Sequence, residues 1–384
     1  MKVLITTDWY QPVINGVVTS IVNLTEGLKA LGYEVKILTL SNNKKSYVDG
    51  DVIYIGSIGA EKVYPNARIS INTHNKLVKD LIMWKPDIVH SQCEFSTFLF
   101  ARYIAKKCHI PLVHTYHTVY EDFTHYFAPN VKLGKYMASK FSRWILNKTQ
   151  VVIAPTNKTK QLITKYGVKS PVFVIPSGLN LSQFLSQMKQ SDRKKLRKKY
   201  GIKDSDEVLI FLGRLAKEKN IDELFKLLKE DINKNLKLLL VGDGPYRNQL
   251  EDMVDNLKIR NQVIFTGMVS PKDVPNYYKM SDIFVSASQS ETQGLTYIEA
   301  MASGLAILCR DDPCLSDVVE NGKNGFTYTS AEEFHKILSR LLIDVNCRKN
   351  VGKQAMITVS ENFSIKGFAR EVSKVYNALV ITQN

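Results

Sequence analysis

The sequence has few cysteines, no long apolar run and none of the usual marks of a secreted or membrane-spanning protein. Its five cysteines are Cys93, Cys108, Cys309, Cys314 and Cys347. An odd count without a CxxC pair argues against a disulfide framework or a zinc ribbon and is typical of a reducing cytoplasm. No run approaches the roughly 18 apolar residues of a transmembrane helix, and the first apolar run is too short for a signal peptide. We therefore expect a cytoplasmic protein that meets any membrane from the side.

Several short motifs of catalysis and cofactor binding are also missing. No GxGxxG follows an expected strand, and neither GxxxxGK[ST] nor GxSxG occurs. These absences argue against a dinucleotide site of the usual type, P-loop phosphoryl transfer and a serine-hydrolase elbow. The DxD segments 49–51 and 204–206 match metal-dependent sugar transferases, but they stand in polar surroundings and we interpret them as turn carboxylates. The pair His114 and His117 has no third ligand nearby in sequence, so we expect no bound metal.

The composition is that of a globular protein with a surplus of positive charge. Of the 384 residues, 44% are hydrophobic and 23% are charged, and these ordinary values exclude fibrous and disordered classes. The 52 lysines and arginines outnumber the 37 acidic residues, which gives a net charge of +15. That surplus indicates an anionic partner, either nucleic acid, a phosphorylated ligand or an anionic membrane surface. Because no nucleic-acid-binding motif accompanies it, we expect no nucleic-acid partner.

Short β-branched runs alternate with helical segments along most of the chain. One series extends from the expected strand 2–6 to 172–175, and a second from 208–212 to 306–309. This alternation predicts an α/β protein with two Rossmann-like, doubly wound parallel-sheet domains facing a cleft. The predicted boundaries are 1–178 for the first domain, 179–362 for the second, and 363–384 for a C-terminal helix that packs back on the first.

Ligands of such sheets bind beyond the carboxyl ends of the strands, so the loops that directly follow strands carry the candidate residues. In the second half, Glu291 and Glu299 are separated by seven residues, one in a loop and the other on the helix after it. Gly294, between them, allows a close backbone approach. The N–H groups at the helix start, around Leu295 and Thr296, can hold an anion. Capping explains Glu291 alone, but it does not explain a second glutamate on an apolar helix face.

Cations and a histidine follow other expected strands. Arg214 and Lys219 come after the strand 208–212, where two cations can neutralise a diphosphate. In the first half, the amide of Gly16 can face an anion where the first strand meets the first helix. His117 ends another strand, and its place at a carboxyl end makes it a candidate substrate contact rather than a packed histidine. It lies beside an aromatic and acidic cluster of Tyr116, Tyr120, Glu121, Asp122, Phe123, His125, Tyr126 and Phe127.

Taken in order, these residues resemble glycosyltransferase family 4, whose members are retaining enzymes of the GT-B fold. The motifs that carry the resemblance span nearly the whole chain: Gly16, His117, Gly213-Arg214, Lys219, Val241-Gly242-Asp243-Gly244-Pro245 and the Glu291/Glu299 pair. Segments 117–126 and 290–300 are further similar to the bacterial diacylglycerol glucosyltransferases, which make monoglucosyldiacylglycerol. The resemblance implies a hexosyltransferase that moves glucose from UDP-glucose to the 3-hydroxyl of 1,2-diacylglycerol at the cytoplasmic membrane surface.

The resemblance also implies a role for each candidate residue. Arg214 and Lys219 would stabilise the UDP leaving group as its negative charge develops. Glu291 would bind a sugar hydroxyl, and His117 would contact the sugar from the acceptor side. No cofactor or obligatory metal is implied, because side-chain cations carry the charge. The donor-binding residues would be Gly16, Gly213, Gly294, Leu295, Thr296 and Glu299, the last of them on the ribose.

A lipid acceptor implies contact with an anionic phospholipid membrane, and two amphipathic helices are candidates for it. The expected helix 131–148 combines an apolar face with five cations and no acid, and a second helix is expected over 69–84. The alternative is that either face packs on its own sheet. The basic run 189–203 is expected to form a solvated helix. The residues assigned to the acceptor and the membrane are Tyr120, Asp122, His125, Tyr126, Lys132, Lys135, Lys140, Arg143 and Trp144.

Three other functions stay open on the sequence alone. A family 4 transferase with another donor sugar or acceptor, such as a mannosyl or cell-wall glycan transferase, would carry the same motifs. A sugar-nucleotide epimerase on a similar fold would turn over its donor without an acceptor. A nucleic-acid-binding module driven by the +15 charge would bind RNA or DNA with steep salt dependence.

Overall fold

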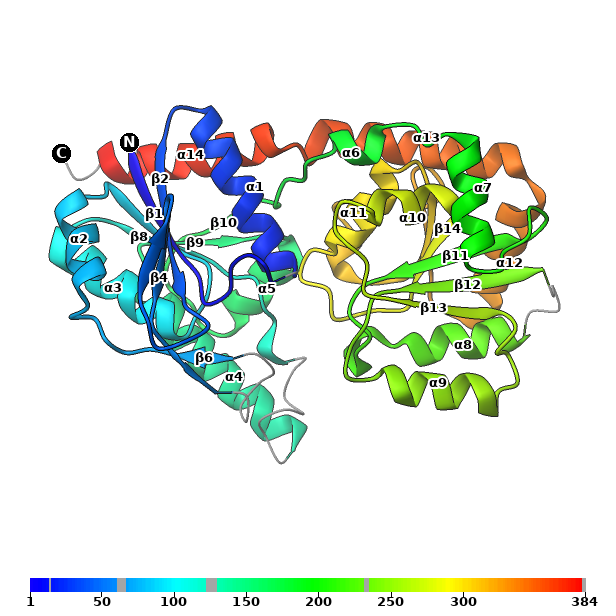
Figure 1. The fold of residues 1–384 in the computed structure, drawn as a ribbon, viewed down its shortest axis with the longest axis horizontal. Coiled ribbons are helices and arrows are strands. Elements are labelled where there is room, and N and C mark those ends of the chain that lie inside the picture. Colours follow the sequence, from blue (N-terminus) through cyan, green and yellow to red (C-terminus); the bar gives the residue numbers. More distant parts are fainter. Residues whose placement is uncertain (14, 61–66, 122–129, 231–234, 382–384) are drawn as a thin grey trace. The chain divides into compact units, whose positions relative to one another are not determined.

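The computed structural model describes residues 1–13, 15–60, 67–121, 130–230 and 235–381. The chain divides into two units (Figure 1). Unit 1 comprises Met1–Leu179 together with Ile365–Asn384, and unit 2 comprises Asn180–Ser364. The last helix of the chain therefore belongs to the unit built by the first half of the sequence. Three residues with an expected acceptor role, Asp122, His125 and Tyr126, lie outside the described residues.

Unit 1 is built on an eight-stranded sheet in the order β10-β9-β8-β7-β1-β2-β4-β3. Its strands pair in parallel except for β3, which is antiparallel to β4. Parallel strands send their carboxyl ends to one edge, which is where β1, β7 and β8 deliver the candidate residues of this unit. The strands are β1 (Lys2–Thr6), β2 (Glu34–Leu40), β3 (Tyr47–Asp49), β4 (Val52–Ile55), β7 (Ile88–Ser91), β8 (Leu112–Thr115), β9 (Val151–Ala154) and β10 (Val172–Val174), with β5 (Ile58–Gly59) and β6 (Arg68–Ile69) as a separate pair.

Helices cover both faces of this sheet. Successive side chains of β1 point to opposite faces, and both faces carry apolar residues that must be buried. Leu4 joins the core beneath one set of helices, whereas Val3 and Ile5 join a second core beneath the others. The first set is α2 (Lys76–Trp84), α3 (Ser96–Cys108), α4 (Val131–Leu146) and α5 (Asn157–Lys165). The second set is α1 (Gly16–Ala30) and the C-terminal helix α14 (Ile365–Ile381).

Helix α14 packs closely against α1, and Figure 1 shows the two side by side. A Cβ added to Gly27 of α1 would lie only 2.6 Å from the Cβ of Ala369, so glycine permits this close approach. Tyr376 of α14 also bonds His90 of β7, with 2.6 Å between the hydroxyl and Nδ1. The C-terminal helix is thus an integral part of the core of unit 1.

One helix of unit 1 begins later than the sequence pattern predicts. We expect a helix over 69–84, but Arg68–Ile69 forms β6 and α2 begins only at Lys76. The reason is local, because Asn75 caps the helix by accepting a hydrogen bond from the backbone N–H of Leu77, 2.9 Å away.

Unit 2 is built on a six-stranded parallel sheet in the order β13-β12-β11-β14-β15-β16. Side chains such as Leu209, Leu238 and Phe225 form the core between the sheet and the helices on one face. The strands are β11 (Glu207–Leu212), β12 (Leu236–Val241), β13 (Val263–Gly267), β14 (Ile283–Ser286), β15 (Ala306–Arg310) and β16 (Phe326–Tyr328). The helices are α6 (Ser182–Leu185), α7 (Gln190–Lys199), α8 (Ile221–Glu230), α9 (Arg247–Asn256), α10 (Val274–Met280), α11 (Leu295–Ala302), α12 (Ala331–Ile343) and α13 (Val345–Asn362).

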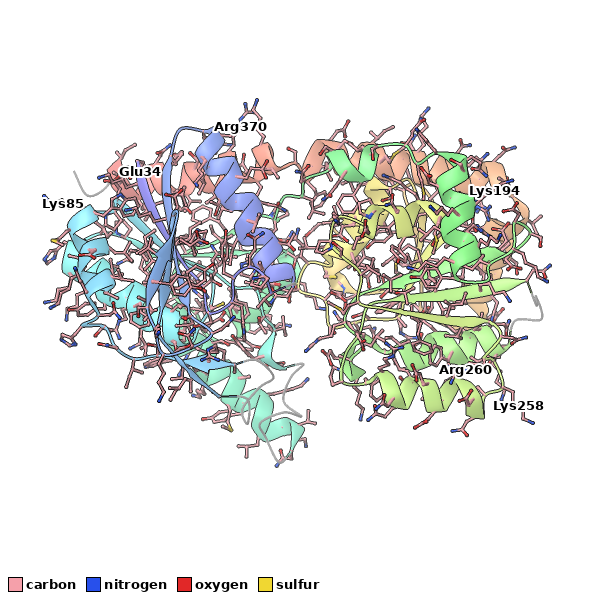
Figure 2. All side chains as sticks on the ribbon, in the orientation of Figure 1. Glu34, Lys85, Lys194, Lys258, Arg260 and Arg370 are labelled. Atoms are coloured by element: carbon pink, nitrogen blue, oxygen red, sulfur yellow. The ribbon has the colours of Figure 1, made fainter. Side chains whose placement is uncertain are left out.

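Most of the basic run 189–203 forms helix α7 (Gln190–Lys199), but this helix is not solvated throughout as expected. Its exposed side chains include Lys194, which projects from the helix in Figure 2. Arg197, by contrast, is 1% exposed. Its guanidinium donates to the carbonyl oxygens of Met280 at 3.2 Å and Lys203 at 3.0 Å. It also pairs with the carboxylate of Asp282, which directly precedes β14. Burial of this one cation is compensated by acceptors that the sequence pattern does not reveal.

Candidate active site

The loops after β11 and β12 are hydrogen-bonded to each other at the carboxyl edge of the sheet of unit 2. The N–H of Gly213 donates to Val241 O and the N–H of Leu215 donates to Asp243 O, each at 3.0 Å. Gly242 has φ of +133°, and a Cβ there would lie 2.0 Å from the carbonyl oxygen of Gly213. Backbone packing therefore requires glycine at position 242, and the packed loops carry Arg214 at the edge of the sheet.

Charged side chains from two loops meet at this edge. Nζ of Lys219 lies 2.6 Å from Oε1 of Glu291, although the two residues are 72 positions apart. Arg214 bonds Glu218, four residues on, and the carbonyl of Glu218 accepts from Ser290 Oγ at 2.9 Å. The structure thus brings Lys219 and Glu291 into direct contact. It also adds Glu218, a buried partner of Arg214 that was missed although the i,i+4 spacing could have indicated it.

The helix that carries the second glutamate begins at the same edge. Gly294 caps α11 with φ of +74°, and a Cβ there would lie 2.8 Å from the ring of Tyr297. Leu295 and Thr296 are the first two residues of the helix, where backbone N–H groups have no acceptor within the helix and can bind an anion. The hydroxyl of Tyr297 donates to Ser286 Oγ at the end of β14, 2.7 Å away. The helix start is therefore fixed to the strand that precedes it.

Glu299 lies one turn further along α11. Its Oε2 accepts a hydrogen bond from the hydroxyl of Tyr278 in α10 at 3.0 Å. Burial raises the pKa of the Glu299 carboxyl to about 7, although the bond from Tyr278 acts in the opposite direction. This carboxyl therefore changes charge near neutral pH. Nothing in the sequence pattern pointed to Tyr278, because the contact joins two helices.

A histidine and a glycine occupy the carboxyl edge of unit 1. Gly16 is exposed at the start of α1, where Asn15 Oδ1 accepts from the N–H of Val18 at 2.9 Å. His117 follows β8, with its Nε2 2.7 Å from Gln92 Oε1 at the end of β7. Burial lowers the pKa of His117 to about 3, so its ring is neutral at physiological pH.

A buried carboxylate, Glu94, contacts residues that lie before and after this histidine in the sequence. Glu94 accepts from the hydroxyl of Tyr120 at 2.5 Å and lies 3.2 Å from Nε2 of His114. The ring of Tyr120 in turn packs edge-on against Phe141 of α4 and Phe95, with centroids 5.9 Å apart in each case. The expected acceptor residue Tyr120 is therefore placed between the polar cluster and α4. The sequence pattern indicated the aromatic cluster but not Glu94.

Helix α4 presents a surface that is both basic and apolar. Leu133, Tyr136, Met137 and Trp144 are 43–60% exposed. Two other apolar residues of the helix are covered, since Phe141 is half-buried and Ile145 is buried. Between the exposed apolar residues lie exposed cations, and two of them, Lys140 and Arg143, line a surface hollow beside Trp144. The exposed cations of the helix are Lys132, Lys135, Lys140 and Arg143.

The other candidate membrane helix, α2, is less available. Trp84, at its end, donates from Nε1 to Glu34 Oε1 at 2.7 Å and lies beneath the amines of Lys2 and Lys36. Val78 and Leu81 are buried in the core, although Met83 is 69% exposed. Of the two helices, α4 therefore leaves more of its apolar face uncovered.

Carboxylates of both DxD segments are paired with cations or backbone N–H groups of their own unit. Asp51 pairs with Lys29 at 2.6 Å, Asp204 pairs with Lys194 at 3.3 Å, and Asp206 Oδ2 accepts from the N–H of Lys203 at 2.8 Å. Among the residues that the structure describes, no group of three or more histidine, cysteine, aspartate or glutamate side chains could hold a metal ion. Within the same residues, no helix is both long and apolar enough to cross a membrane.

Two Rossmann-like units with charged loops at the carboxyl ends of parallel strands define the GT-B class of glycosyltransferases. The fold is similar to that of HepE from Anabaena, solved in complex with UDP and glucose, with a TM-score of 0.79 at 18% identity over 99% of this chain and 100% of that one. Residues 14–183 match the model of "Glycosyltransferase Family 4", and residues 192–357 match that of "Glycosyl transferases group 1".

Two curated relatives cover almost the whole chain. An alpha-monoglucosyldiacylglycerol synthase of Streptococcus pneumoniae is 34% identical over 100% of this chain and 87% of its own length. One of Acholeplasma laidlawii is 35% identical over 97% of this chain and 94% of its own length. The chain therefore belongs to glycosyltransferase family 4, as its motifs predicted.

Proposed function

We propose that this glycosyltransferase moves glucose from UDP-glucose to the 3-hydroxyl of 1,2-diacylglycerol, with retention of anomeric configuration, at the inner face of the cell membrane. The observation that carries the proposal is the full-length likeness to relatives named for glucosyl transfer to diacylglycerol. The HepE structure, which holds UDP and glucose, supports a UDP-sugar as the donor. The charged edge of unit 2 and the surface of α4 supply the two kinds of contact that such a reaction needs.

The edge of unit 2 suits a nucleotide diphosphate. Arg214 and Lys219 provide positive charge for the diphosphate as the bond to the sugar breaks. The first-turn N–H groups at Leu295 and Thr296 add donors of the kind that hold phosphates at helix starts. We assign Glu299 to the ribose hydroxyls. Because these groups carry the charge, the proposed reaction requires no divalent cation.

The transfer itself is proposed to proceed on one face of the sugar. The bond between the anomeric carbon and the diphosphate oxygen breaks, and the acceptor oxygen bonds to the same carbon from the same side. The acceptor proton passes to the departing diphosphate. Glu291, oriented by Lys219 at 2.6 Å, binds a sugar hydroxyl, and the neutral ring of His117 contacts the sugar from the acceptor side. Gly16 contributes a backbone N–H.

The acceptor is insoluble in water, so the enzyme must reach it at a membrane surface. The exposed aromatic and aliphatic side chains of α4 can enter the interface while neighbouring cations meet anionic headgroups. We therefore propose that α4 is the membrane contact and that the enzyme binds peripherally from the cytoplasm.

Donor turnover with and without lipid separates this proposal from its alternatives. The enzyme is incubated in parallel with UDP-glucose, UDP-galactose, UDP-N-acetylglucosamine and GDP-mannose, and nucleotide release and sugar identity are followed. We expect UDP release from UDP-glucose only when diacylglycerol vesicles are present. A changed sugar nucleotide without an acceptor would identify an epimerase, and turnover of another donor would identify a different family 4 transferase.

A further inference from the structure

Two polar residues that follow β7 contact the histidine after β8 or its neighbours in the sequence. Strands β7 and β8 are hydrogen-bonded neighbours in the sheet, with Ser91 opposite His114. Gln92 and Glu94 therefore emerge next to the segment that contains His117. Both are almost completely buried, with exposed fractions of 2% and 5%.

Gln92 contacts the ring of His117 directly. Its Oε1 lies 2.7 Å from Nε2, and this is the only hydrogen bond of the ring within the part of the chain that the structure describes. With the amide oxygen as the acceptor, Nε2 carries the hydrogen and Nδ1 keeps its lone pair, and we adopt this orientation of the amide. A neutral histidine held in this way can accept a hydrogen bond at Nδ1 and cannot donate one there.

Glu94 contacts residues on both sides of His117. Its Oε1 lies 3.2 Å from Nε2 of His114, three residues before, and its Oε2 accepts from the hydroxyl of Tyr120, three residues after. One carboxylate thus bridges the strand end and the turn between which the histidine is held. The titratable groups facing His117 include His114 on its own strand and His90 on β7.

This arrangement of buried polar groups lowers the stability of the fold. A buried carboxylate must be compensated by donors, and Gln92 leaves its Nε2 without a partner among the described residues. Apolar side chains would fill the same space without such unmet hydrogen bonds. The buried amide of Gln92 makes one hydrogen bond, to a ring nitrogen of His117. Orientation of that ring would explain why an amide stands at this position.

We propose that Gln92 and Glu94 are positioning residues: they hold His117 as the Nε2-protonated neutral form and leave Nδ1 to accept a hydrogen bond from a substrate hydroxyl. The inference rests on the proposed function of His117 in sugar transfer. Neither residue needs to touch substrate, because Gln92 acts through the ring and Glu94 through the backbone on either side of it.

The direct test reads the histidine ring in the substrate-free enzyme. Full-length protein carrying ¹⁵N-histidine is studied by two-bond ¹H–¹⁵N correlation from pH 5 to 8, and His117 is assigned by its loss in His117→Ala. We expect the Nε2-protonated neutral ring throughout this range. An Nδ1-protonated ring, which a Gln92 amide turned end over end would produce, overturns the proposal.

A charged substitution at Gln92 tests the contact between this residue and the ring of His117. Gln92→Glu places a carboxylate against Nε2, so the pKa of His117 should rise until the ring titrates between pH 5 and 8. Because the cationic ring can no longer accept at Nδ1, kcat/KM should fall about tenfold per pH unit below that raised pKa. The matched control is Gln150→Glu, since Gln150 accepts from the N–H of Leu112 at the opposite end of β8. An unchanged His117 titration in Gln92→Glu would overturn the proposal.

Glu94 is tested by the split between kcat and KM. Tyr120→Phe removes one arm of the bridge and Glu94→Gln removes its charge, and we expect kcat to fall by about 100-fold with little change in KM for the donor. If Glu94→Gln does not fold, Tyr120→Phe alone provides this test. A wild-type kcat in Tyr120→Phe would contradict the positioning role of Glu94. The ring measurement is independent of turnover: a correct ring in an enzyme that does not glucosylate diacylglycerol contradicts the proposed function, whereas active enzyme with the wrong tautomer contradicts the positioning.

Discussion

The amine of Lys219 lies 2.6 Å from a carboxylate oxygen of Glu291, joining the loop after β11 to the loop after β14. The contact links a residue assigned to the diphosphate with a residue assigned to the sugar. Each is one-fifth exposed or less, with 20% for Lys219 and 15% for Glu291, so their pairing is only partly screened by water. The donor would therefore meet a pair whose two charges already orient each other.

Loss of either cation should reduce turnover. Lys219→Ala and Arg214→Ala should each lower kcat by about 100-fold, because each removes positive charge where the transition state develops negative charge. Steady-state kinetics with UDP-glucose measures the effect. Lys217→Ala is the matched control, since Lys217 lies exposed in the same turn as Lys219. Near-normal kcat in either variant would reject the leaving-group assignment for that residue.

Donor affinity should depend on pH through Glu299. Its pKa is raised to about 7, so the carboxyl is mostly neutral at pH 6 and mostly ionised at pH 8. Since the ionised form accepts better from the ribose hydroxyls, UDP-glucose should bind about tenfold more tightly at pH 8, in the ratio of the ionised fractions. Calorimetry of Glu299→Gln should show a flat profile. Glu299→Ala should lose about 1–3 kcal/mol of binding free energy, and unchanged affinity there would remove the ribose role.

The close packing of α1 on α14 should make Gly27 intolerant of a branched side chain. Gly27→Val should lower the free energy of unfolding by about 1–3 kcal/mol, because its Cβ would overlap Ala369 and force the helices apart. Chemical denaturation measures the difference. Glu26→Val places the same residue at an exposed position of the same helix and should change stability by only a few tenths of a kcal/mol. Equal stability of the two variants would show that α14 does not constrain α1.

Membrane binding should depend on the cations of α4. Charge reversal of Lys132, Lys135, Lys140 and Arg143 should weaken binding to anionic vesicles by about 1 kcal/mol per residue near the surface. UDP binding should not change. Added salt should weaken wild-type binding, because the Debye length is only about 8 Å at physiological ionic strength.

The control for that experiment is on unit 2. Lys194, Lys195, Lys198 and Lys199 are four exposed cations of α7, and their reversal changes the net charge equally. Vesicle co-sedimentation should show little effect of this second set. A larger effect of the α7 set would place the membrane contact elsewhere, and equal binding to neutral and anionic vesicles would remove the electrostatic role of the net charge.

Removal of divalent cations should leave activity largely intact. The proposed charge stabilisation comes from Arg214 and Lys219, so a chelator should change glucosyl transfer little. Activity is measured after dialysis against the chelator and again after Mg²⁺ or Mn²⁺ is restored. Complete loss of activity that is restored by a divalent ion would indicate that the DxD segments are metal ligands.

Local patterns in the sequence carried the prediction of the fold. Periodicity and turn residues are short-range signals, so the strands that end before Gly213 and Gly242 and the helix that begins after Gly294 could be predicted together with the edge at which they meet. The start of α2 could not, because the apolar residue Ile71 fits the helical period of Val78 although Asn75 caps the helix four residues later.

Contacts between distant segments account for what the sequence did not reveal. The bond from Tyr278 to Glu299 joins two helices, and Arg197 is buried by carbonyl groups that have no side-chain signature. The roles of Gln92 and Glu94 depend on the pairing of β7 with β8, and no pattern within either strand marks them. The candidate residues could thus be placed at the carboxyl edges of the sheets, whereas the partners that orient them required the three-dimensional structure.

The most direct measurement of the central claim is product analysis after reaction of the enzyme with UDP-[¹³C]glucose and diacylglycerol in anionic vesicles. The lipid fraction is isolated, and NMR determines the sugar, the position of attachment and the anomeric configuration. We predict a single α-linked glucose on the 3-hydroxyl of 1,2-diacylglycerol, formed about 100-fold more slowly by Lys219→Ala. A β-linked product would contradict the retaining mechanism. Labelled sugar on another acceptor, or none in lipid, would contradict the proposed function itself.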